Sequence, residues 1–376
     1  MNTSNEYIVK GELGDKLDRD FVPIANNVIQ SHKLPGFAIG IVADAEIVYA
    51  KGFGVKNIDT QEPITPTTIF HMASISKPFV ATAIVQLVEK GQIQLDAPVV
   101  TYLPYFDLDD ARAGSITVQQ MLSHVSGMPD VEDYEWYNPQ YDEGALERYV
   151  RGLTPQKLLT EPGTTFAYSN MAFECLGDVI AKVSGMSFAD YVKKQILDPA
   201  GMTESTFLKP EHLPETWAAP HVQDPATRVW EGYPYNRRHG PSSTLHASAI
   251  ETCNWAITNL QRGSFEGQRI LDPLSYDVLW KPWAEIGEGE QMGLSWFLAE
   301  YRGERIVQHG GNDMGFRAHL VMLPDKMAAA VVLCNLMPAP AWEIACSALD
   351  IALGYEPNPI TPPGDSPTRV QENGAN

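Results

Sequence analysis

The hydrophobic and polar positions fall into three blocks along the chain, and the first block predicts a helix followed by two strands. Apolar residues recur every three or four positions from Leu17 to Ile29, which is the spacing of an amphipathic helix. Strand-forming residues are then concentrated in Gly36–Val42 and Glu46–Gly54, with only three residues between them. Two such runs joined by a short turn are typical of an antiparallel hairpin.

The middle block has mainly helical spacing. Its most apolar run, Val80–Val88, follows a turn-rich segment, and Thr117–Ser123 predicts a short helix whose first residue is a capping threonine. Two more helices are expected at Phe173–Val183 and Phe188–Leu197. The segment Thr216–His246 has poor periodicity and many turn formers. Its tryptophans and tyrosines predict ordered pocket walls, because long irregular segments in compact domains are usually functional when they are not disordered.

The last block returns to strands. They are predicted at Leu294–Ala299, Arg305–His309, Phe316–Leu323 and Ala328–Cys334, before a closing helix at Ala341–Leu353. This order predicts an α/β (α+β) fold, in which an antiparallel sheet is built from N- and C-terminal strands and flanked by helices. A mostly helical lobe is then inserted between the two groups of strands.

We expect a single two-lobed domain over residues 10–355. The sheet lobe takes about 10–70 plus 290–355, and the helical lobe takes about 71–289. Residues 356–376 are rich in proline, glycine and polar residues, which predicts a disordered tail. A chain of 376 residues is long enough for a core of this size.

Composition and charge exclude several classes of partner and site. Hydrophobic residues make up 44% and charged residues 20%, which is ordinary for a globular enzyme. The formal net charge of −20 argues against binding to nucleic acid or an anionic membrane, because both require a basic face. The four cysteines (Cys175, Cys253, Cys334 and Cys346) are widely spaced in apolar segments. They are interpreted as buried free thiols, and not as a disulfide framework or a zinc site.

The sequence also predicts neither a secretory segment nor a membrane-spanning one. The segment Met1–Asp20 is polar and has no apolar core, so it does not resemble a secretory signal. No stretch has the apolar length of a membrane-spanning helix. A cytoplasmic location is therefore expected.

Candidate chemistry begins where the most apolar helix starts, with Ser74 three residues before Lys77. On a helix these two side chains share one face, about a turn apart. A serine at a helix N-terminus is near free backbone N–H groups, which favour developing negative charge. The lysine can remove the serine's proton once its pKa is lowered by burial or neighbours. Such a pair also occurs as a capping serine beside a surface lysine, so its partners decide its meaning.

Two further signals follow downstream. Tyr168-Ser169-Asn170 stands between a turn and a predicted helix, and His309-Gly310-Gly311 stands at the end of a predicted strand. An adjacent lysine ammonium and local N–H donors are expected to lower the pKa of Tyr168 from about 10 to near 7, so that Tyr168 and Lys77 titrate together. The two glycines leave the backbone of an edge strand open to close approach by a substrate.

In this order, the three signals resemble the motifs of the serine β-lactamase-related hydrolases. That family has the penicillin-binding-protein fold and includes class C β-lactamases, family VIII carboxylesterases and D-aminopeptidases. Further segments that look like the family are Gly91–Tyr105, Leu122–Gly127, Pro162–Asn170 and Gly201–Thr203. The resemblance covers roughly residues 20–353 and implies a β-lactamase/transpeptidase-like fold.

The resemblance also implies the chemistry. Ser74 would be the nucleophile that forms an acyl-enzyme, and Lys77 and Tyr168 would transfer protons. The backbone N–H groups of Ser74 and Asn312 would form the oxyanion hole. No metal or organic cofactor is implied, and the expected partner is a small ester or amide substrate.

By motif position, the substrate would be bound by Asn170, His309, Gly310 and Gly311. The third motif departs from the family, whose lactamases and peptidases usually carry Lys-Thr-Gly there. A histidine is mostly neutral at pH 7, so its presence favours neutral esters, amides or lactones over substrates with a carboxylate. Carboxylesterase is therefore the leading activity. The alternatives are a β-lactamase, a D-amino-acid amidase or peptidase, an acyltransferase, and a non-catalytic ligand-binding or scaffold protein.

Other sites are less favoured. The chain has no G-x-S-x-G elbow of the α/β-hydrolases and no H-E-x-x-H zinc motif. His124 has no orienting acid nearby in the sequence, so we expect it to play a structural hydrogen-bonding role. For His309, a contact with substrate and a packed position at the end of a strand are about equally favoured. Arg237-Arg238-His239 is interpreted as a solvated loop, with a grip on a substrate carboxylate as the less favoured reading.

Overall fold

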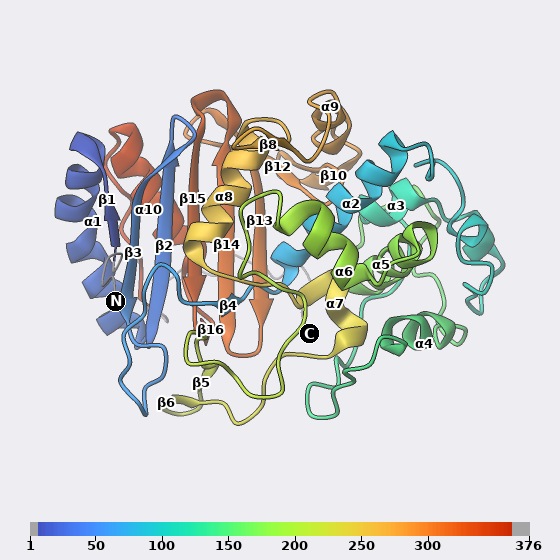
Figure 1. The fold of residues 1–376 in the computed structure, drawn as a ribbon, viewed down its shortest axis with the longest axis horizontal. Coiled ribbons are helices and arrows are strands. Elements are labelled where there is room, and N and C mark those ends of the chain that lie inside the picture. The colour runs from blue at the N-terminus through green and yellow to red at the C-terminus, as the bar shows by residue number, and fades with distance from the viewer. Residues whose placement is uncertain (1–6, 363–376) are drawn as a thin grey trace.

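The computed structural model describes residues 7–362, and its centre is a nine-stranded sheet in which every neighbouring pair of strands is antiparallel (Figure 1). The strands, in spatial order, are β1 (Tyr7–Val9), β3 (Glu46–Gly54), β2 (Gly36–Ala43), β15 (Ala328–Cys334), β14 (Phe316–Leu323), β13 (Glu304–Asp313), β12 (Phe297–Tyr301), β11 (Glu290–Met292) and β10 (Ala284–Gly287). The predicted hairpin is confirmed as β2 and β3. The two ends of the chain meet where β2 pairs with β15, for example at Ile41 and Ala330. The sheet is therefore built from N- and C-terminal strands, as predicted.

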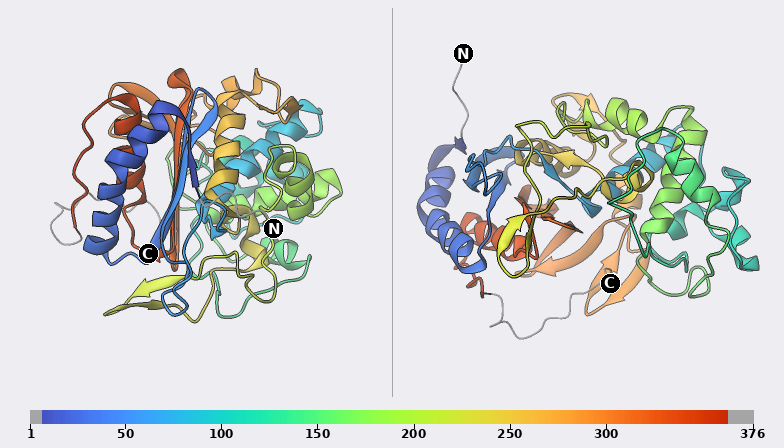
Figure 2. Two further views of the ribbon diagram at one scale, coloured as in Figure 1. Left: turned by 60° about the vertical axis from the view of Figure 1, so that its left-hand side comes forward. Right: turned by 90° about the horizontal axis from the view of Figure 1, so that it is seen from below.

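Helices cover both faces of this sheet. On one face lie α1 (Gly11–His32) and α10 (Ala341–Leu353), and on the other lies α8 (Ala249–Leu260) (Figure 2). Because both faces are covered, the central strands β2 and β15 are buried almost throughout. Such strands have continuous apolar runs in place of strict alternation.

Side-chain alternation along the strands divides the apolar interior into two cores. In β2, Ile39 and Ile41 point to the core under α1 and α10, while Ala38 and Val42 point to the opposite core. The second core continues into the helical region, where the rings of Phe79 and Trp255 stack with their centroids 4.3 Å apart. The sheet and the helical region thus share one continuous apolar interior.

The helical region lies between β3 and β10 in the sequence (Figure 1). Its helices are α2 (Lys77–Glu89), α3 (Val118–Leu122), α4 (Ala145–Arg151), α5 (Asn170–Ser184), α6 (Phe188–Val192), α7 (Gly240–Ser243) and α9 (Ser275–Leu279). The predicted capping threonine is confirmed, because Thr117 accepts from the backbone of Gln120 and the Gln120 side chain accepts from the backbone of Thr117.

Short elements connect these helices. Single turns are η1 (Ser74–Ser76), η2 (Val99–Thr101), η3 (Ala111–Ser115), the π turn η4 (Lys193–Leu197), η5 (Arg237–His239) and η6 (Pro324–Lys326). Small strands are β4 (Phe70–His71), β5 (His221–Gln223), β6 (Thr227–Val229), β7 (His246–Ala247), β8 (Ser264–Phe265), β9 (Gln268–Arg269) and β16 (Leu336–Met337). Residues 216–246 are irregular, as predicted, apart from the short elements β5, β6, η5 and α7 and the first residue of β7.

Some boundaries differ from the prediction. Ser295 has a φ of 67°, which interrupts an extended chain, so the strand expected from Leu294 begins only at Phe297. The helix expected at 188–197 changes to a π turn after Val192. All four cysteines are buried and free, as predicted. Of the expected tail, residues 363–376 lie outside the described residues, and the division into two lobes stays a prediction. Within residues 7–362, no helix is both long enough and apolar enough to span a bilayer.

Candidate active site

Ser74 stands at a strained turn between β4 and α2. Ala73, directly before it, has φ 48° and ψ −132°, a conformation that residues with a side chain rarely adopt. The turn η1 then leads into α2 at Lys77, so Ser74 and Lys77 share one side of the helix start as predicted. Ser74 remains partly exposed, while its neighbours in sequence are buried. The strained turn therefore presents one hydroxyl to solvent at the head of a buried helix.

Lys77 is fully buried behind Ser74. Its Nζ donates to Ser74 Oγ at 2.9 Å and to the carbonyl oxygen of Ser242 at 2.8 Å. Burial lowers the pKa of Lys77 to about 8, although the carboxylates of Asp130, Glu174 and Asp313 oppose the shift. A substantial fraction of this lysine is therefore neutral near pH 7–8, and the neutral amine is within hydrogen-bonding distance of the serine hydroxyl.

Tyr168 lies beside this pair but does not ionise as expected. Lys77 Nζ is 4.9 Å from the centroid of the Tyr168 ring, so the ammonium faces the ring itself. Burial raises the pKa of Tyr168 above its usual value. A hydrogen bond with Ser74 opposes this shift, and Asp130 and Asp313 add to it. The expectation of a pKa near 7 is wrong for this structure, because burial and two carboxylates outweigh the hydrogen bond with Ser74. The Tyr168 hydroxyl therefore keeps its proton at neutral pH.

His124 supports Tyr168 from behind. Their rings stack with centroids 4.1 Å apart, and His124 Nδ1 accepts from the backbone N–H of Ser169 at 3.1 Å. Because Nδ1 accepts, the proton of the neutral ring is on Nε2. Burial holds the pKa of His124 well below its usual value. The histidine therefore has the structural hydrogen-bonding role that was predicted, and it fixes the turn that carries Tyr168.

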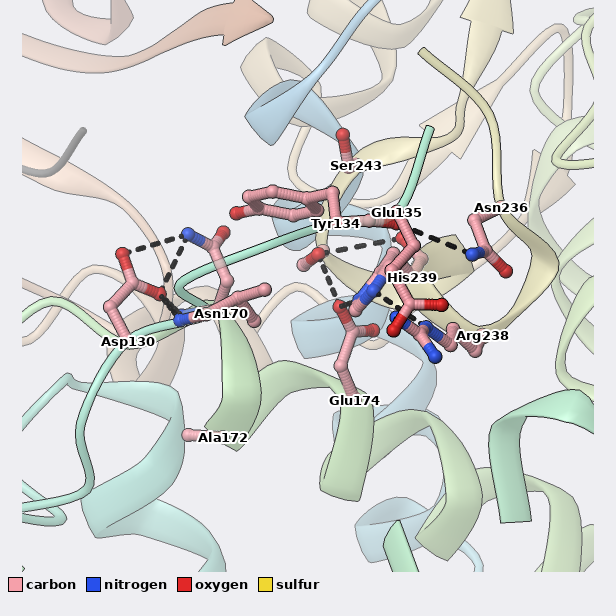
Figure 3. Close-up of polar contacts among 12 residues, drawn as sticks. Asp130, Tyr134, Glu135, Asn170, Ala172, Glu174, Asn236, Arg238, His239 and Ser243 are labelled. Carbon is pink, nitrogen blue, oxygen red and sulfur yellow. Dashed lines mark hydrogen bonds and ion pairs between the residues drawn. The ribbon is translucent and has the colours of Figure 1, made fainter. Parts of the chain in front are cut away.

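Asp130, which was not identified from the sequence, orients the side chain of Asn170, the first residue of α5. Asn170 Nδ2 donates to Asp130 at 2.9 and 3.1 Å, and its backbone N–H donates to the same group at 2.7 Å (Figure 3). Ser169 caps the helix by accepting from the N–H of Ala172 at 3.1 Å. With the amide nitrogen held by Asp130, the amide oxygen is left to face an incoming donor.

The third motif lies on β13, the strand that borders η1. From His309 to Asp313 this strand pairs with β14 only, because its pairing with β12 ends at Gln308. A Cβ on Gly311 would come within 2.1 Å of the carbonyl oxygen of Met72. Glycine is therefore required at position 311 for β13 to approach the turn before Ser74. This close approach is packing within the protein, so the expected approach of a substrate to the strand backbone stays a prediction.

His309 supplies no positive charge to the site. It is buried, and its Nδ1 donates to the carbonyl oxygen of Gly310 at 2.7 Å. Burial, with Lys77 nearby, lowers the pKa of His309 to about 3. The side chain is thus neutral at pH 7, as its residue type suggested. Its Nε2 is buried without a partner among the described residues, so the packed reading and the substrate-contact reading both remain.

The end of β13 is anchored by three side chains that the sequence analysis missed. Asp313 Oδ2 accepts from His71 Nε2 at 2.8 Å and also from Ser243 Oγ. These residues come from β13, β4 and α7, three elements far apart in the sequence. The anchor fixes the strand immediately after Asn312, whose backbone N–H is the predicted oxyanion donor.

The segment Arg237–His239 is not a solvated loop, so that interpretation is wrong. His239 is fully buried against Glu174, and the Arg238 side chain is only 12% exposed, with an ion pair to Glu135 at 3.0 Å. Side chains that the sequence places at the surface are buried here beside acidic groups. Among residues 7–362, no group of three or more His, Cys, Asp or Glu side chains could hold a metal ion.

A family model described as Beta-lactamase matches residues 21–350 of this chain. The chain belongs to the Beta-lactamase family. The resemblance inferred from the three motifs is thereby confirmed, and membership supports an activity of the serine hydrolase type. The fold agrees with this family, because its large antiparallel sheet and helices match those of the structural neighbours.

The solved structures similar to this Beta-lactamase family member include a penicillin-binding protein homologue and a class C β-lactamase. An octameric penicillin-binding protein homologue from Pyrococcus abyssi is 28% identical, with a TM-score of 0.79 over 92% of this chain and 78% of that one. A class C β-lactamase from Rhodobacter sphaeroides shares the fold at 21% identity, with a TM-score of 0.71 over 89% of this chain and 98% of that one.

Two curated proteins are similar to this chain at about the same sequence identity. Penicillin-binding protein 4 from Amycolatopsis lactamdurans is 26% identical over 318 residues, which cover 81% of each chain. Protein flp from Staphylococcus aureus is 26% identical over 317 residues, which cover 83% of this chain. The match spans only 62% of the length of protein flp.

Proposed function

We propose that this protein is a serine hydrolase that forms an acyl-enzyme on small ester or amide substrates, with carboxylesterase as its leading activity. One observation carries the proposal: the buried amine of Lys77 lies 2.9 Å from the Ser74 hydroxyl, and its pKa of about 8 makes it a base near neutral pH. The same contact also exists before substrate arrives, so the nucleophile is prepared in the free enzyme.

The proposed reaction begins as neutral Lys77 takes the Ser74 proton and Ser74 Oγ forms a bond to the substrate carbonyl carbon. The carbonyl oxygen becomes an oxyanion between the backbone N–H groups of Ser74 and Asn312. As the intermediate collapses, the Tyr168 hydroxyl gives a proton to the leaving alcohol or amine, and Lys77 restores the proton of Tyr168. Water then attacks the acyl-enzyme by the same route in reverse and releases the acid.

Electrostatics supports neutral substrates. Three carboxylates, Asp130, Glu174 and Asp313, act on Lys77 from around the site, and His309 is neutral where related lactamases carry a lysine. A substrate carboxylate would therefore come near these acidic side chains, while the neutral His309 offers no charge to bind it. Neutral acyl groups on esters and amides avoid that cost.

A β-lactamase or D-amino-acid amidase is the second candidate. It is supported by the structural neighbours, which include a D-alanine carboxypeptidase from Burkholderia cenocepacia, similar in fold with a TM-score of 0.73. An acyltransferase differs only in the acceptor that attacks the acyl-enzyme, and a non-catalytic ligand-binding role would show no acyl-enzyme at all.

Intact-protein mass spectrometry tests these alternatives together. The protein is incubated with p-nitrophenyl acetate and butyrate, nitrocefin, D-alanine p-nitroanilide and a fluorophosphonate, with Ser74→Ala as the control. We expect an added mass on Ser74, absent in the variant, and fastest turnover of the esters. An adduct on another residue would contradict the assignment of Ser74. No adduct in a folded protein would favour the ligand-binding alternative.

A further inference from the structure

A chain of hydrogen bonds leaves Lys77 on the side opposite to Ser74 and ends on a buried carboxylate. The carbonyl oxygen of Ser242 accepts from Lys77, and the hydroxyl of the same serine donates to Glu174. Glu174 lies on α5, is fully buried, and points toward η5 (Figure 3). Ser242 therefore joins the proposed base to Glu174 through its two polar groups.

His239 completes the surroundings of Glu174, and its hydrogen bonds fix its protonation. Arg238 Nε–H donates to His239 Nε2 at 3.0 Å, and an arginine is always a donor. The proton of the neutral imidazole is therefore on Nδ1, which donates to Glu174 Oε1 at 3.1 Å. Burial, with Arg238 close by, lowers the pKa of His239 to about 3, so this ring stays neutral. Two donors, His239 and Ser242, thus converge on a single carboxylate oxygen.

We propose that Glu174 is a positioning residue for Lys77, which holds the lysine against Ser74 through Ser242 and sets the pH at which the lysine becomes a base. This inference rests on the proposed function. The geometry carries it: among residues 7–362, Lys77 donates to the Ser74 hydroxyl and to the carbonyl oxygen of Ser242, and the hydroxyl of Ser242 donates to Glu174. Movement of Ser242 would therefore move the amine relative to Ser74.

Charge gives Glu174 its second effect. The groups that act on Lys77 are the carboxylates of Asp130, Glu174 and Asp313, the rings of Tyr168 and Phe173, and the neutral histidines His124 and His309. The groups around Glu174 itself are Lys77, Asp130, Ser242, His239, Tyr134, Tyr149 and Cys175. Burial raises its pKa well above the usual value, while Ser242 and Lys77 oppose that shift. Ionised Glu174 stabilises the lysine ammonium, and protonated Glu174 releases the neutral amine.

The test is the Glu174→Gln variant, which keeps the shape and an acceptor but removes the charge. With one negative neighbour gone, the pKa of Lys77 should fall below about 8, and the acidic limb of the kcat/KM profile should move to lower pH by about one unit. A merely structural role would lower activity without moving the limb. A limb unchanged within about 0.2 unit would overturn the proposal, because a charge acting on the base must appear as a shift of at least that size.

Asp178→Asn is the matched control. Asp178 lies one turn further along α5, is also buried, and accepts from the Tyr105 hydroxyl at 2.6 Å, but it does not act on Lys77. We expect it to lose stability with no movement of the limb. Where Glu174→Gln fails to fold, Ser242→Ala removes the hydroxyl donor and keeps the carbonyl that holds Lys77. It should move the limb in the same direction by a smaller amount, and no movement would again overturn the proposal.

The pKa of Lys77 can also be measured without turnover. The ¹³Cε shift of Lys77 is followed against pH in lysine-labelled protein and assigned with Lys77→Arg. A lowered pKa in Glu174→Gln, in a protein that no substrate acylates, would support the positioning role and refute the proposed function. An unchanged pKa in a protein that forms the Ser74 adduct would refute the positioning role and leave the proposed function intact.

Discussion

The pH dependence of acylation follows from the environment of Lys77. The structure places Lys77, with a pKa of about 8, beside Ser74, while burial raises the pKa of Tyr168 above its usual value. The limb of a kcat/KM profile reports the pKa of the essential base in the free enzyme. In the proposed reaction, the position of this limb would therefore identify which of the two side chains removes the proton of Ser74.

The expected magnitude can be worked out from that value. For a base of pKa about 8, about a tenth is neutral at pH 7 and about half at pH 8. The rate constant should thus rise about tenfold from pH 6 to 7, about fivefold from pH 7 to 8, and level off above pH 9. A base with the raised pKa of Tyr168 would instead give a rise of about tenfold per unit through pH 9 and beyond.

The assay is hydrolysis of a p-nitrophenyl ester by initial rates, recorded at the isosbestic wavelength of the product so that its own ionisation does not contribute. Lys77→Arg is the control, because a guanidinium does not lose its proton in a protein. This variant should lose the limb together with at least about 10²-fold of the rate. A plateau already reached at pH 7 would refute Lys77 as the base, and a rate still rising steeply above pH 9 would assign the role to Tyr168.

Three further outcomes are expected. Asp130→Ala should lower kcat/KM by about 10- to 100-fold, because the buried Asn170 amide loses its charge-assisted hydrogen-bond partner. Steady-state kinetics of the variant and the wild type would measure this loss. Lys77→Met should abolish acylation, yet below pH 8 it should unfold with an equal or higher free energy, by up to about 3 kcal/mol, in urea titrations. The variant is expected to be more stable because the pKa of Lys77 is lower in the folded protein than in the unfolded chain. Protonation of Lys77 therefore destabilises the fold below pH 8, and this effect fades between pH 8 and 10.5. Gly311→Ala should destabilise the protein by about 1–3 kcal/mol in thermal unfolding, because its Cβ would overlap the carbonyl of Met72; an unchanged midpoint would contradict that close approach.

The sequence predicts best where local pattern and final environment agree. The strands Phe316–Leu323 and Ala328–Cys334 and the helix Ala341–Leu353 have the bounds that were predicted, because their apolar runs end at clear turn residues. The helix α8, which covers the sheet, was not predicted. Its sequence contains Thr252, Asn254, Thr258 and Asn259, which have low helix propensity, and tertiary burial stabilises it instead.

In the candidate site, too, some features could be predicted from the sequence and others could not. Ser74 and Lys77 are related by helical spacing, so their proximity could be predicted from the sequence alone. Asp130 and Glu174 could not, because each is a single acidic residue without a motif, and only folding brings them to the site. The pKa of Tyr168 was predicted in the wrong direction for a related reason. Burial, the main cause of the raised pKa, and the carboxylates from distant segments both arise only on folding.

The pairing of β2 with β15 also sets the order in which the molecule can be completed during synthesis. The hairpin of β2 and β3 leaves the ribosome before β15, the strand that covers its inner edge, because the whole helical region lies between them in the sequence. Residues 304–313, which border Ser74, also follow the helical region. A nascent chain therefore holds Ser74 without its bordering strand until those residues have been made. The central sheet and the surroundings of Ser74 can be completed only after β13 and β15 have emerged.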